Sequence, residues 1–351
     1  MSERKVVRIG TSHYHVGHIV PAMVAHEMTY FEQEGLNRYV FYHGGLIPAI
    51  AEKIALARAM KEKSVDIVPD VKPSSLFQLA ARGEELFIVG CWRNRQDFQF
   101  FGAKGLKSLA DLKGKKIGTR DIGGIGHTVF SLQLKRAGLD PAKDVTFVRG
   151  ARFHPNEKPE ETLRSGEVDC IHLHAYDARG LDQEGYPMLL ESRKLYPGGR
   201  PDRVIVATRR MVEQDSDLLM AYLRATIRAY WFMTDYARNR PYLEALVRRL
   251  RYACLDEEEA ARSGLEGGAR LSLPIDGAPS ATGLEQMAWE CKEMGEIGKD
   301  FELKPLLRLE FVQRAFKELQ EREDLQDQIG LVREIYAKRD KAWGSSMKIS
   351  S

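Results

Sequence analysis

Histidine is the residue type best able to do chemistry in this 351-residue chain, because imidazole donates, accepts and binds metals near neutral pH. All nine histidines lie before residue 175, and several of them fall where a predicted β-strand ends: His13, His15, His43, His172 and His174. In layered α/β proteins the carboxyl ends of strands border the ligand crevice. The spacing therefore predicts that these imidazoles line one polar cleft.

Composition and charge limit the class of protein. The chain is 43% hydrophobic and 29% charged, which is typical of a folded globular protein. Its 53 basic and 50 acidic residues nearly cancel, so we expect no nucleic-acid partner. No run of about 18 apolar residues occurs, so we expect no insertion into a membrane. The length exceeds the roughly 250–300 residues that one hydrophobic core usually supports, which predicts two lobes.

The cysteines and the N-terminus give two further expectations. Cys91, Cys170, Cys254 and Cys291 are far apart and form no C-x-x-C pair, so we expect core thiols and neither a disulfide framework nor a zinc knuckle. Residues 1–10 carry no long apolar stretch followed by a small-residue cleavage site. If Met1 is the true start, a cytoplasmic location is expected.

The order of predicted elements indicates an α/β fold. Short β-rich runs alternate with helical ones up to residue 208, which predicts βαβ units and a largely parallel sheet. Helices are expected at 19–33, 47–61 and 74–81, and long amphipathic helices at 217–239, 242–251, 309–322 and 325–340 would clad the C-terminal part. A segment rich in Gly, Ser and Pro, 263–282, predicts an extended loop crossing the surface. Strands are expected at 6–10, 38–42, 65–68, 86–91, 98–103, 116–119, 145–148, 169–174, 188–191 and 204–208.

Three phrases resemble periplasmic solute-binding proteins of the nitrate/sulfonate/taurine class. Residues 29–36, TYFEQEGL, resemble that family's G-x-F-x-x-E-G-L, with Thr29 in place of the usual Gly. Residues 108–118, SLADLKGKKIG, resemble L-x-D-L-K-G-K-x-I-G, which opens the family's second lobe. Residues 166–169, GEVD, resemble G-x-V-D-A. The phrases occur in the family's order over most of the first 240 residues.

The resemblance implies a type II periplasmic-binding fold, in which two α/β lobes are joined by two crossovers and hold a ligand cleft between them. Lobe one would be residues 1–96 and 202–351, the latter including the C-terminal helices, and lobe two would be 97–201. Ligand binding would favour a closed arrangement over an open one.

Candidate ligand contacts follow from the strand ends and the resemblance. Imidazoles, a lysine and free amides at a helix start can all bind the oxygens of an anion. The alternatives are a core histidine, a solvated lysine and an aromatic that only packs in the hinge. The predicted contacts are His13, Tyr14, His15, His43 and Lys72 in lobe one, Trp92 and Arg93 at the first crossover, and Arg120, Gly124, His127 and His174 in lobe two.

The leading hypothesis is therefore a binding protein for a small organic anion, such as a sulfonate, a carboxylate or an aromatic or heterocyclic acid. By resemblance it would be periplasmic, serve an ABC permease, need no cofactor and catalyse no reaction.

The alternative is a cytosolic enzyme on the same fold, with a decarboxylase or lyase activity and cleft histidines as general acid and base. His13, His15, His43, His127 and His174 could also converge on a divalent metal, although their spacing matches no known metal motif. The C-C-C-F-C segment of the related pyrimidine synthase has no counterpart here, and the loop after the first strand lacks the cysteine of the related desulfinase. A cytosolic ligand sensor is a third option.

Overall fold

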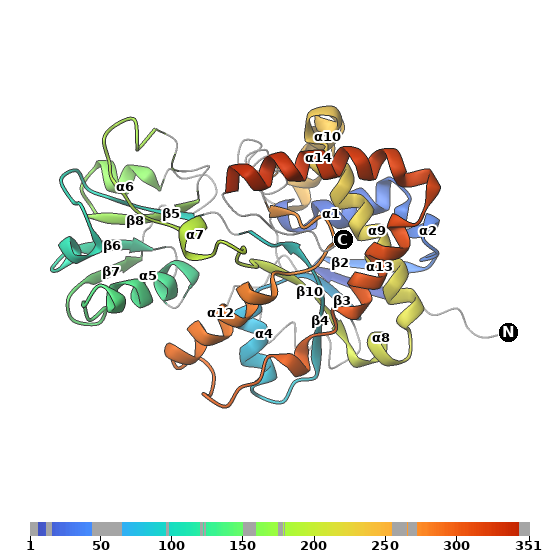
Figure 1. The fold of residues 1–351 in the computed structure, drawn as a ribbon, viewed down its shortest axis with the longest axis horizontal. Coiled ribbons are helices and arrows are strands. Elements are labelled where there is room, and N and C mark those ends of the chain that lie inside the picture. Colours follow the sequence, from blue (N-terminus) through green and yellow to red (C-terminus); the bar gives the residue numbers. More distant parts are fainter. Residues whose placement is uncertain are drawn as a thin grey trace. The chain divides into compact units, whose positions relative to one another are not determined.

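The computed structural model describes residues 6–11, 16–43, 65–95, 98–119, 122, 124–149, 159–174, 178, 180–254, 265 and 272–343. The chain divides into two compact units (Figure 1). Unit 1 comprises Met1–Gln96 and Gly198–Ser351, and unit 2 is Asp97–Pro197. Each unit has its own sheet and its own core.

Within the described residues, unit 1 contains one sheet with the strand order β2-β1-β3-β10-β4. β1 pairs in parallel with β2 and β3, whereas β10 runs antiparallel to both β3 and β4. The strands are β1 (Val7–Thr11), β2 (Tyr39–His43), β3 (Ile67–Val71), β4 (Leu86–Arg93) and β10 (Arg203–Thr208).

Unit 2 repeats this plan in the order β7-β6-β8-β5-β9. β6 pairs in parallel with β7 and β8, and β5 runs antiparallel to β8 and β9. In each sheet the strand that follows a crossover lies next to the third parallel strand: β10 lies beside β3 in unit 1, and β5 lies beside β8 in unit 2. The strands are β5 (Phe98–Gly102), β6 (Lys116–Thr119), β7 (Thr146–Arg149), β8 (Cys170–His174) and β9 (Met188–Glu191).

The two units also share a short sequence motif, with an equivalent hydrogen bond near the start of the strands. β1 and β6 both end in the triplet Ile-Gly-Thr, and a Val-Asp pair directly precedes the third strand, β3 or β8, in each unit. The backbone N–H of Arg8 donates to Asp66 Oδ2 at 2.9 Å, and that of Lys116 donates to Asp169 Oδ2 at 2.9 Å. An equivalent aspartate carboxylate therefore fixes the first strand against the third in each unit.

Each predicted strand is present, with ends shifted by at most a few residues, and the α/β fold class is confirmed. The largest shift is in β3, which was predicted to end at Val68 but includes Pro69 and Asp70. Proline lacks the N–H that a ladder needs, so it is usually found at edges or bulges. Here the register of β10 shifts between Val204 and Val206, opposite Pro69, which accommodates the missing donor.

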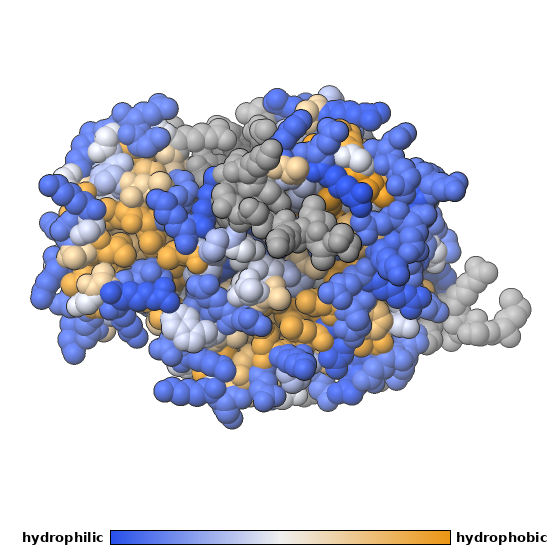
Figure 2. All heavy atoms as spheres, viewed as in Figure 1, coloured by the Kyte–Doolittle hydropathy of each residue, from blue (hydrophilic) through white to orange (hydrophobic). Residues whose placement is uncertain are grey.

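Helices cover both faces of the sheet in unit 1. α9 lies in the larger core with α1, α10, α13 and α14, and α4 packs with α12 on the other face (Figure 1). On the face shown in Figure 2, hydrophilic side chains cover most of the C-terminal helices, as their amphipathic pattern requires. Unit 1 contains α1 (Val16–Glu27), α2 (Tyr30–Gln33), α4 (Pro73–Ala80), α8 (Arg209–Glu213), α9 (Ser216–Thr234), α10 (Tyr236–Cys254), α12 (Ala281–Glu293), η2 (Lys304–Leu306), α13 (Glu310–Gln320), η3 (Glu323–Leu325) and α14 (Gln326–Trp343).

In unit 2, separate cores lie on the two faces of the sheet, one with α5 and the other with α6. The unit contains η1 (Leu109–Leu112), α5 (Ile125–Arg136), α6 (Glu160–Arg164) and α7 (Ser192–Leu195). The predicted helix 47–61 lies outside the described residues. Across the part of the chain that the structure describes, no helix is long and apolar enough to cross a membrane.

The described part of the predicted surface loop 263–282 is not a surface loop. Ser272, Leu273, Pro274, Gly277 and Pro279 are buried, so that expectation is wrong there. Composition suggested exposure because a loop backbone normally needs water to satisfy its polar groups. In this segment the protein itself supplies hydrogen-bond partners to backbone carbonyls.

The backbone conformation at Thr29 explains why Gly is usual at this position of the family phrase. The predicted helix 19–33 breaks between α1 and α2, where Thr29 has φ 55° and ψ 25°. This left-handed conformation suits glycine, and a β-branched residue adopts it only under strain. The family's usual Gly is the residue that this turn favours.

We predict that Thr29→Gly raises the free energy of unfolding by about 1 kcal/mol, since left-handed backbone costs an L-residue about 1–2 kcal/mol. The gain is reduced because Thr29 Oγ1 accepts a 2.9 Å hydrogen bond from Gln33 Nε2. Urea unfolding measures the change. Thr29→Ala keeps the strain and loses the hydroxyl, so a stabilising Thr29→Ala would contradict this explanation.

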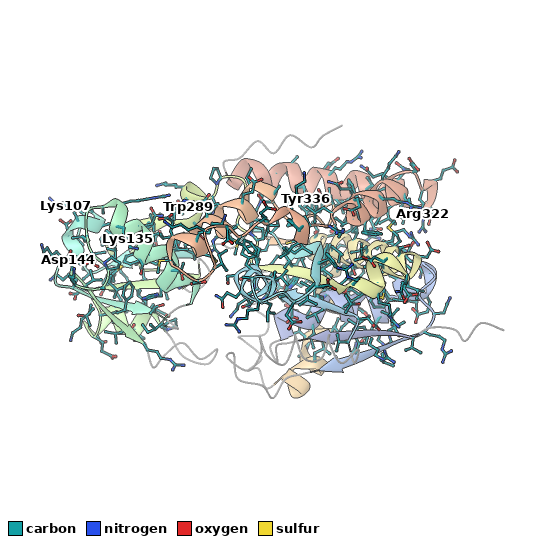
Figure 3. All side chains as sticks on the ribbon, turned by 90° about the horizontal axis from the view of Figure 1, so that it is seen from below. Lys107, Lys135, Asp144, Trp289, Arg322 and Tyr336 are labelled. Atoms are coloured by element: carbon teal, nitrogen blue, oxygen red, sulfur yellow. The ribbon has the colours of Figure 1, made fainter. Side chains whose placement is uncertain are left out.

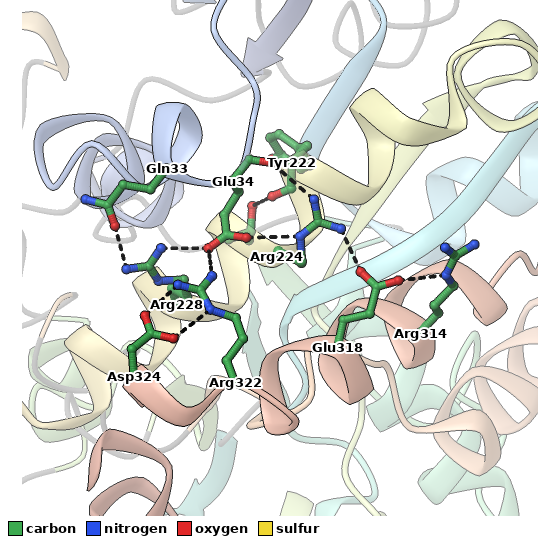
Figure 4. Close-up of polar contacts among 10 residues, drawn as sticks. Gln33, Glu34, Tyr222, Arg224, Arg228, Arg314, Glu318, Arg322 and Asp324 are labelled. Carbon is green, nitrogen blue, oxygen red and sulfur yellow. Dashed lines mark hydrogen bonds and ion pairs between the residues drawn. The ribbon is translucent and has the colours of Figure 1, made fainter. Parts of the chain in front are cut away.

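Glu34, from the same phrase, joins distant parts of unit 1 (Figure 4). Its carboxylate is 4% exposed and pairs with Arg228 at 2.6 Å, Arg224 at 3.0 Å and Arg322 at 2.6 Å. Arg224 and Arg228 come from α9, and Arg322 precedes η3. One carboxylate therefore holds the exit of α2 to the central and C-terminal helices.

We predict that Glu34→Ala costs about 3–5 kcal/mol of unfolding free energy, because removing one partner of a buried ion pair leaves uncompensated charge. Glu318→Ala is the matched control, since Glu318 is 34% exposed and pairs with Arg224 at 2.8 Å. That more exposed pair should contribute about 1 kcal/mol or less. Equal losses in urea unfolding would show that Glu34 has no special role.

Candidate functional site

The carboxyl ends of the parallel strands of unit 1 lie together at one edge of its sheet. β1, β2 and β3 run in parallel, so Thr11, His43 and Lys72 lie at their carboxyl edge or directly after it. β10 runs the other way, so its first residue, Arg203, lies at the same edge, paired in register with Arg93 at the end of β4. The chain therefore leaves unit 1 and returns to it at the edge where ligands bind in α/β folds.

For four of the predicted contacts in unit 1 the structure describes no side chain. His43 closes β2 opposite Thr11, but its side chain is not among the described ones. His13, Tyr14 and His15 lie outside the described residues. Their roles as ligand contacts stay predictions.

Lys72 stands at the start of α4. It is half-buried, extended (φ −69°, ψ 127°) and followed by Pro73 at the first helical position. Proline there is preorganised for a helix and removes an N–H that would have no helical partner. A lysine charge thus lies beside the positive end of the helix at this edge.

Trp92 and Arg93 are held within unit 1. Trp92 is 3% exposed and belongs to the main core. The guanidinium of Arg93 lies 5.6 Å from the centre of the Trp92 ring and 3.3 Å from Asp202 Oδ2. Arg93 is the more accessible member of the pair.

Two arginines that the sequence did not mark as contacts are buried at the crossovers. Arg95 is 1% exposed, and Arg200 pairs with Glu290 at 2.9 Å with both side chains 3% exposed. Arginine is mostly a surface residue, so burial was not expected at either position. The only available signal was their position next to strands that cross between lobes.

The described charges at this edge are nearly balanced, with a small positive excess. Basic and acidic side chains are Lys72, Arg93, Arg95, Arg200 and Arg203 against Asp70, Asp202, Asp276 and Glu290. Burial raises the pKa of Asp276, which disfavours its ionised form. A net positive potential at a strand-end edge favours an anionic ligand.

Unit 2 presents an equivalent edge. Thr119 ends β6, and His174 at the end of β8 pairs in register with Phe98 at the start of β5. Arg120 lies outside the described residues, and the side chain of His174 is not described.

Gly124 and His127 come together at the start of α5. Gly124 caps the helix in an extended conformation, and the ring of His127 packs edge-on against Phe147 with centroids 4.4 Å apart. Gly126 lies over β8, because a Cβ at this position would be 2.8 Å from His172 Nδ1. His172 itself packs between Phe98 and Phe100, with ring centroids at 5.3 and 5.1 Å.

The described residues show neither a metal cluster nor an activated thiol. No group of three or more His, Cys, Asp or Glu residues able to hold a metal forms among them. Burial raises the pKa of the Cys91 and Cys170 thiols well above the usual value and that of Cys291 to about 12. These thiols stay protonated near neutral pH, so they are poor nucleophiles. Because His13, His15 and Cys254 are not covered, the metal hypothesis stays a hypothesis.

The repeated sheet plan and the crossovers at the strand-end edges define a type II periplasmic-binding fold. Solved structures with the same fold include a putative periplasmic sulfonate-binding protein SsuA from Methylobacillus flagellatus (16% identity, 91% of this chain and 96% of that one, TM-score 0.67). Another is the periplasmic aliphatic sulphonate-binding protein SsuA from Escherichia coli (18%, 86% and 92%, 0.63). The desulfurization enzyme DSZB also shares it (14%, 90% and 99%, 0.55).

The family model described as NMT1/THI5 like matches residues 17–239, and the chain belongs to this family. No curated protein matches the chain. At these low identities the solved structures establish the fold and leave the ligand to be inferred from the site.

We predict that Asp276→Asn stabilises the protein at about pH 8 and not at about pH 4. The folded state binds the Asp276 proton more tightly than the unfolded state, since its pKa is raised above 3.8 by burial. Unfolding free energy therefore falls as pH rises through the raised pKa, and asparagine avoids that loss while keeping the 3.0 Å acceptor for the Ala278 N–H. Thermal unfolding at both pH values measures the difference, and the exposed Asp300→Asn change controls for the loss of one charge. An equal gain at both pH values would contradict the assignment.

Proposed function

We propose that this protein binds a small organic anion that carries a sulfonate or carboxylate group, as the substrate-binding component of an ABC importer. Membership of the NMT1/THI5-like family and the shared fold with two sulfonate-binding proteins support this assignment. Such a role implies a membrane permease as partner and a periplasmic location.

The observation that carries the proposal is the arginine-rich edge of unit 1. A guanidinium presents a planar fork of donors that matches the paired oxygens of a carboxylate or sulfonate. Asp202 pairs with Arg93 at 3.3 Å and with Arg203 at 2.9 Å. These ion pairs hold both guanidinium groups at the edge where we propose that the anion binds.

We assign the proposed contacts to each unit separately. In unit 1 they are His13, Tyr14, His15, His43 and Lys72, with Arg93 and the neighbouring Trp92 at the crossover. In unit 2 they are Arg120, Gly124, His127 and His174.

An enzyme remains the second candidate because DSZB, a desulfurization enzyme, has the same fold. The described cysteines do not support thiol chemistry, since burial keeps them protonated. Catalysis would therefore depend on the histidines at the strand ends. Incubating the protein with each stabilising acid, with and without a divalent metal, and analysing the products by mass spectrometry separates turnover from binding.

The proposal predicts that an aliphatic or aromatic sulfonate or carboxylate raises the melting temperature in a thermal-shift screen. At a ligand concentration 100 times Kd the stabilisation should be about 2.7 kcal/mol. Arg93→Ala should weaken binding about tenfold or more, because a charge-assisted hydrogen bond contributes roughly 1.5–3 kcal/mol.

Arg209→Ala is the matched control. Arg209 follows β10 at the opposite edge and pairs with Glu85 at 2.6 Å and Glu213 at 2.9 Å on the surface. It should leave ligand affinity unchanged. Stabilisation by amines in place of acids, or equal losses of affinity in both variants, would refute anion binding at this edge.

A further inference from the structure

Residues 272–280 form a segment without an exposed residue, here called the strap, that lies beside β4 and directly precedes α12. The backbone N–H of Cys91 donates to the Gly277 carbonyl at 2.7 Å, and that of Asn94 donates to the Ser272 carbonyl at 2.7 Å. The strap thus continues the hydrogen bonding of the sheet past the point where β4 ends at Arg93. It follows the chain into the first crossover.

The other side of the strap is fixed to the core helices of unit 1. Trp231 Nε1 on α9 donates to the Ile275 carbonyl at 2.8 Å. The hydroxyl of Tyr336 on α14, marked in Figure 3, donates to the Leu273 carbonyl. These carbonyls are satisfied by protein donors, so the strap can stay buried.

Asn94 connects the strap to the first crossover through its side chain. It is 5% exposed, and its Oδ1 accepts a 2.6 Å hydrogen bond from the backbone N–H of Ser280. The hydroxyl of Ser272 donates to the Arg95 carbonyl at 2.8 Å. The strap therefore holds the backbone directly between and after the two crossover arginines, Arg93 and Arg95.

The second crossover packs against the first crossover and against α12. Gly199 packs so closely that a Cβ there would lie 2.8 Å from the Asn94 carbonyl oxygen, and a Cβ at Gly283 would lie 2.4 Å from the Gly199 carbonyl oxygen. Arg200 is anchored to Glu290 on α12, the helix that follows the strap, at 2.9 Å. The backbone N–H of Asp202 donates to the Arg93 carbonyl at 2.7 Å.

We propose that the strap fixes the unit 1 ends of both crossovers, and that Asn94 is the positioning residue that keeps Arg93 and Arg95 in place. The part concerning the arginines rests on the proposed function, because it assumes that this edge binds the anion. The mechanical part does not, since it concerns only how freely the crossovers bend. With the strap bound to Asn94, Arg95 and the residues before it stay fixed to unit 1, as do Gly199 and the residues after it, so bending does not reach them. Without that contact, bending extends into unit 1.

The test measures the spread of distances between the units by double electron–electron resonance in the absence of ligand. Spin labels go on Lys135→Cys in α5 (Figure 3) and on Lys317→Cys in α13, both exposed positions. Cys254→Ser supplies the background, because Cys91, Cys170 and Cys291 are buried. Asn94→Ala removes the acceptor of the Ser280 N–H, and it is expected to broaden the distance distribution.

Ser280→Ala is the matched control. It removes the hydroxyl that caps α12 by accepting from the Gly283 N–H at 3.0 Å, but it keeps the backbone N–H that donates to Asn94. Loss of a cap lowers stability, so this variant reports on destabilisation with the strap still seated. Its distance distribution should match that of the parent.

An Asn94→Ala distribution as narrow as the parent's, or equal broadening in both variants, would overturn the proposal. A result that supports the strap while no acid stabilises the protein would refute anion binding alone. The two proposals therefore fail separately.

Discussion

The organisation of the molecule depends on one constraint of strand pairing. In each sheet a strand adjoining a crossover lies antiparallel beside the third parallel strand, as β10 does beside β3 and β5 beside β8. An antiparallel strand starts at the edge where its parallel neighbours end. Both crossovers must therefore meet the strand-end edge of each unit, and side chains next to the crossovers are brought to the edge where ligands bind in this class of fold. Arg93 and Arg203, more than 100 residues apart, face each other in register for this reason.

Buried polar contacts hold distant parts of unit 1 together in two places. Glu34 joins α2 to α9 and to the start of η3 through its arginine partners, and the strap joins β4 to α9 and α14 through its carbonyls. Such contacts stabilise the fold only while every partner is present. The left-handed turn at Thr29 directly precedes α2, the helix that ends next to Glu34.

Prediction from the sequence worked best where a signal is local. Short β-rich runs between helical ones predicted the strands correctly, because strands buried on both faces of a sheet form continuous apolar runs. Prediction failed at Pro69, where β3 bulges against its partner strand β10 and the missing donor is accommodated, and at the strap, where Gly, Ser and Pro imply exposure. In both places the deciding partner lies far away in the chain. The Ile-Gly-Thr triplet and the Val-Asp pair occur in both units, but they are too short to reveal a repeat in the sequence. Their correspondence becomes clear from the equivalent hydrogen bond that the aspartate accepts in each unit.

The sequence by itself determined the α/β class, the succession of strands, the family phrases and a set of strand-end residues with polar side chains. It also marked Thr29 as unusual, although only the backbone angle explains why glycine is favoured there. Tertiary structure decided which charges are buried, since Arg95 and Arg200 have no local pattern that separates them from surface arginines. It also decided that Asn94 serves the strap. The hydrogen-bond partners of Arg200 and Asn94 lie 90 and 186 residues away in the chain, and no property of the neighbouring residues encodes such partners.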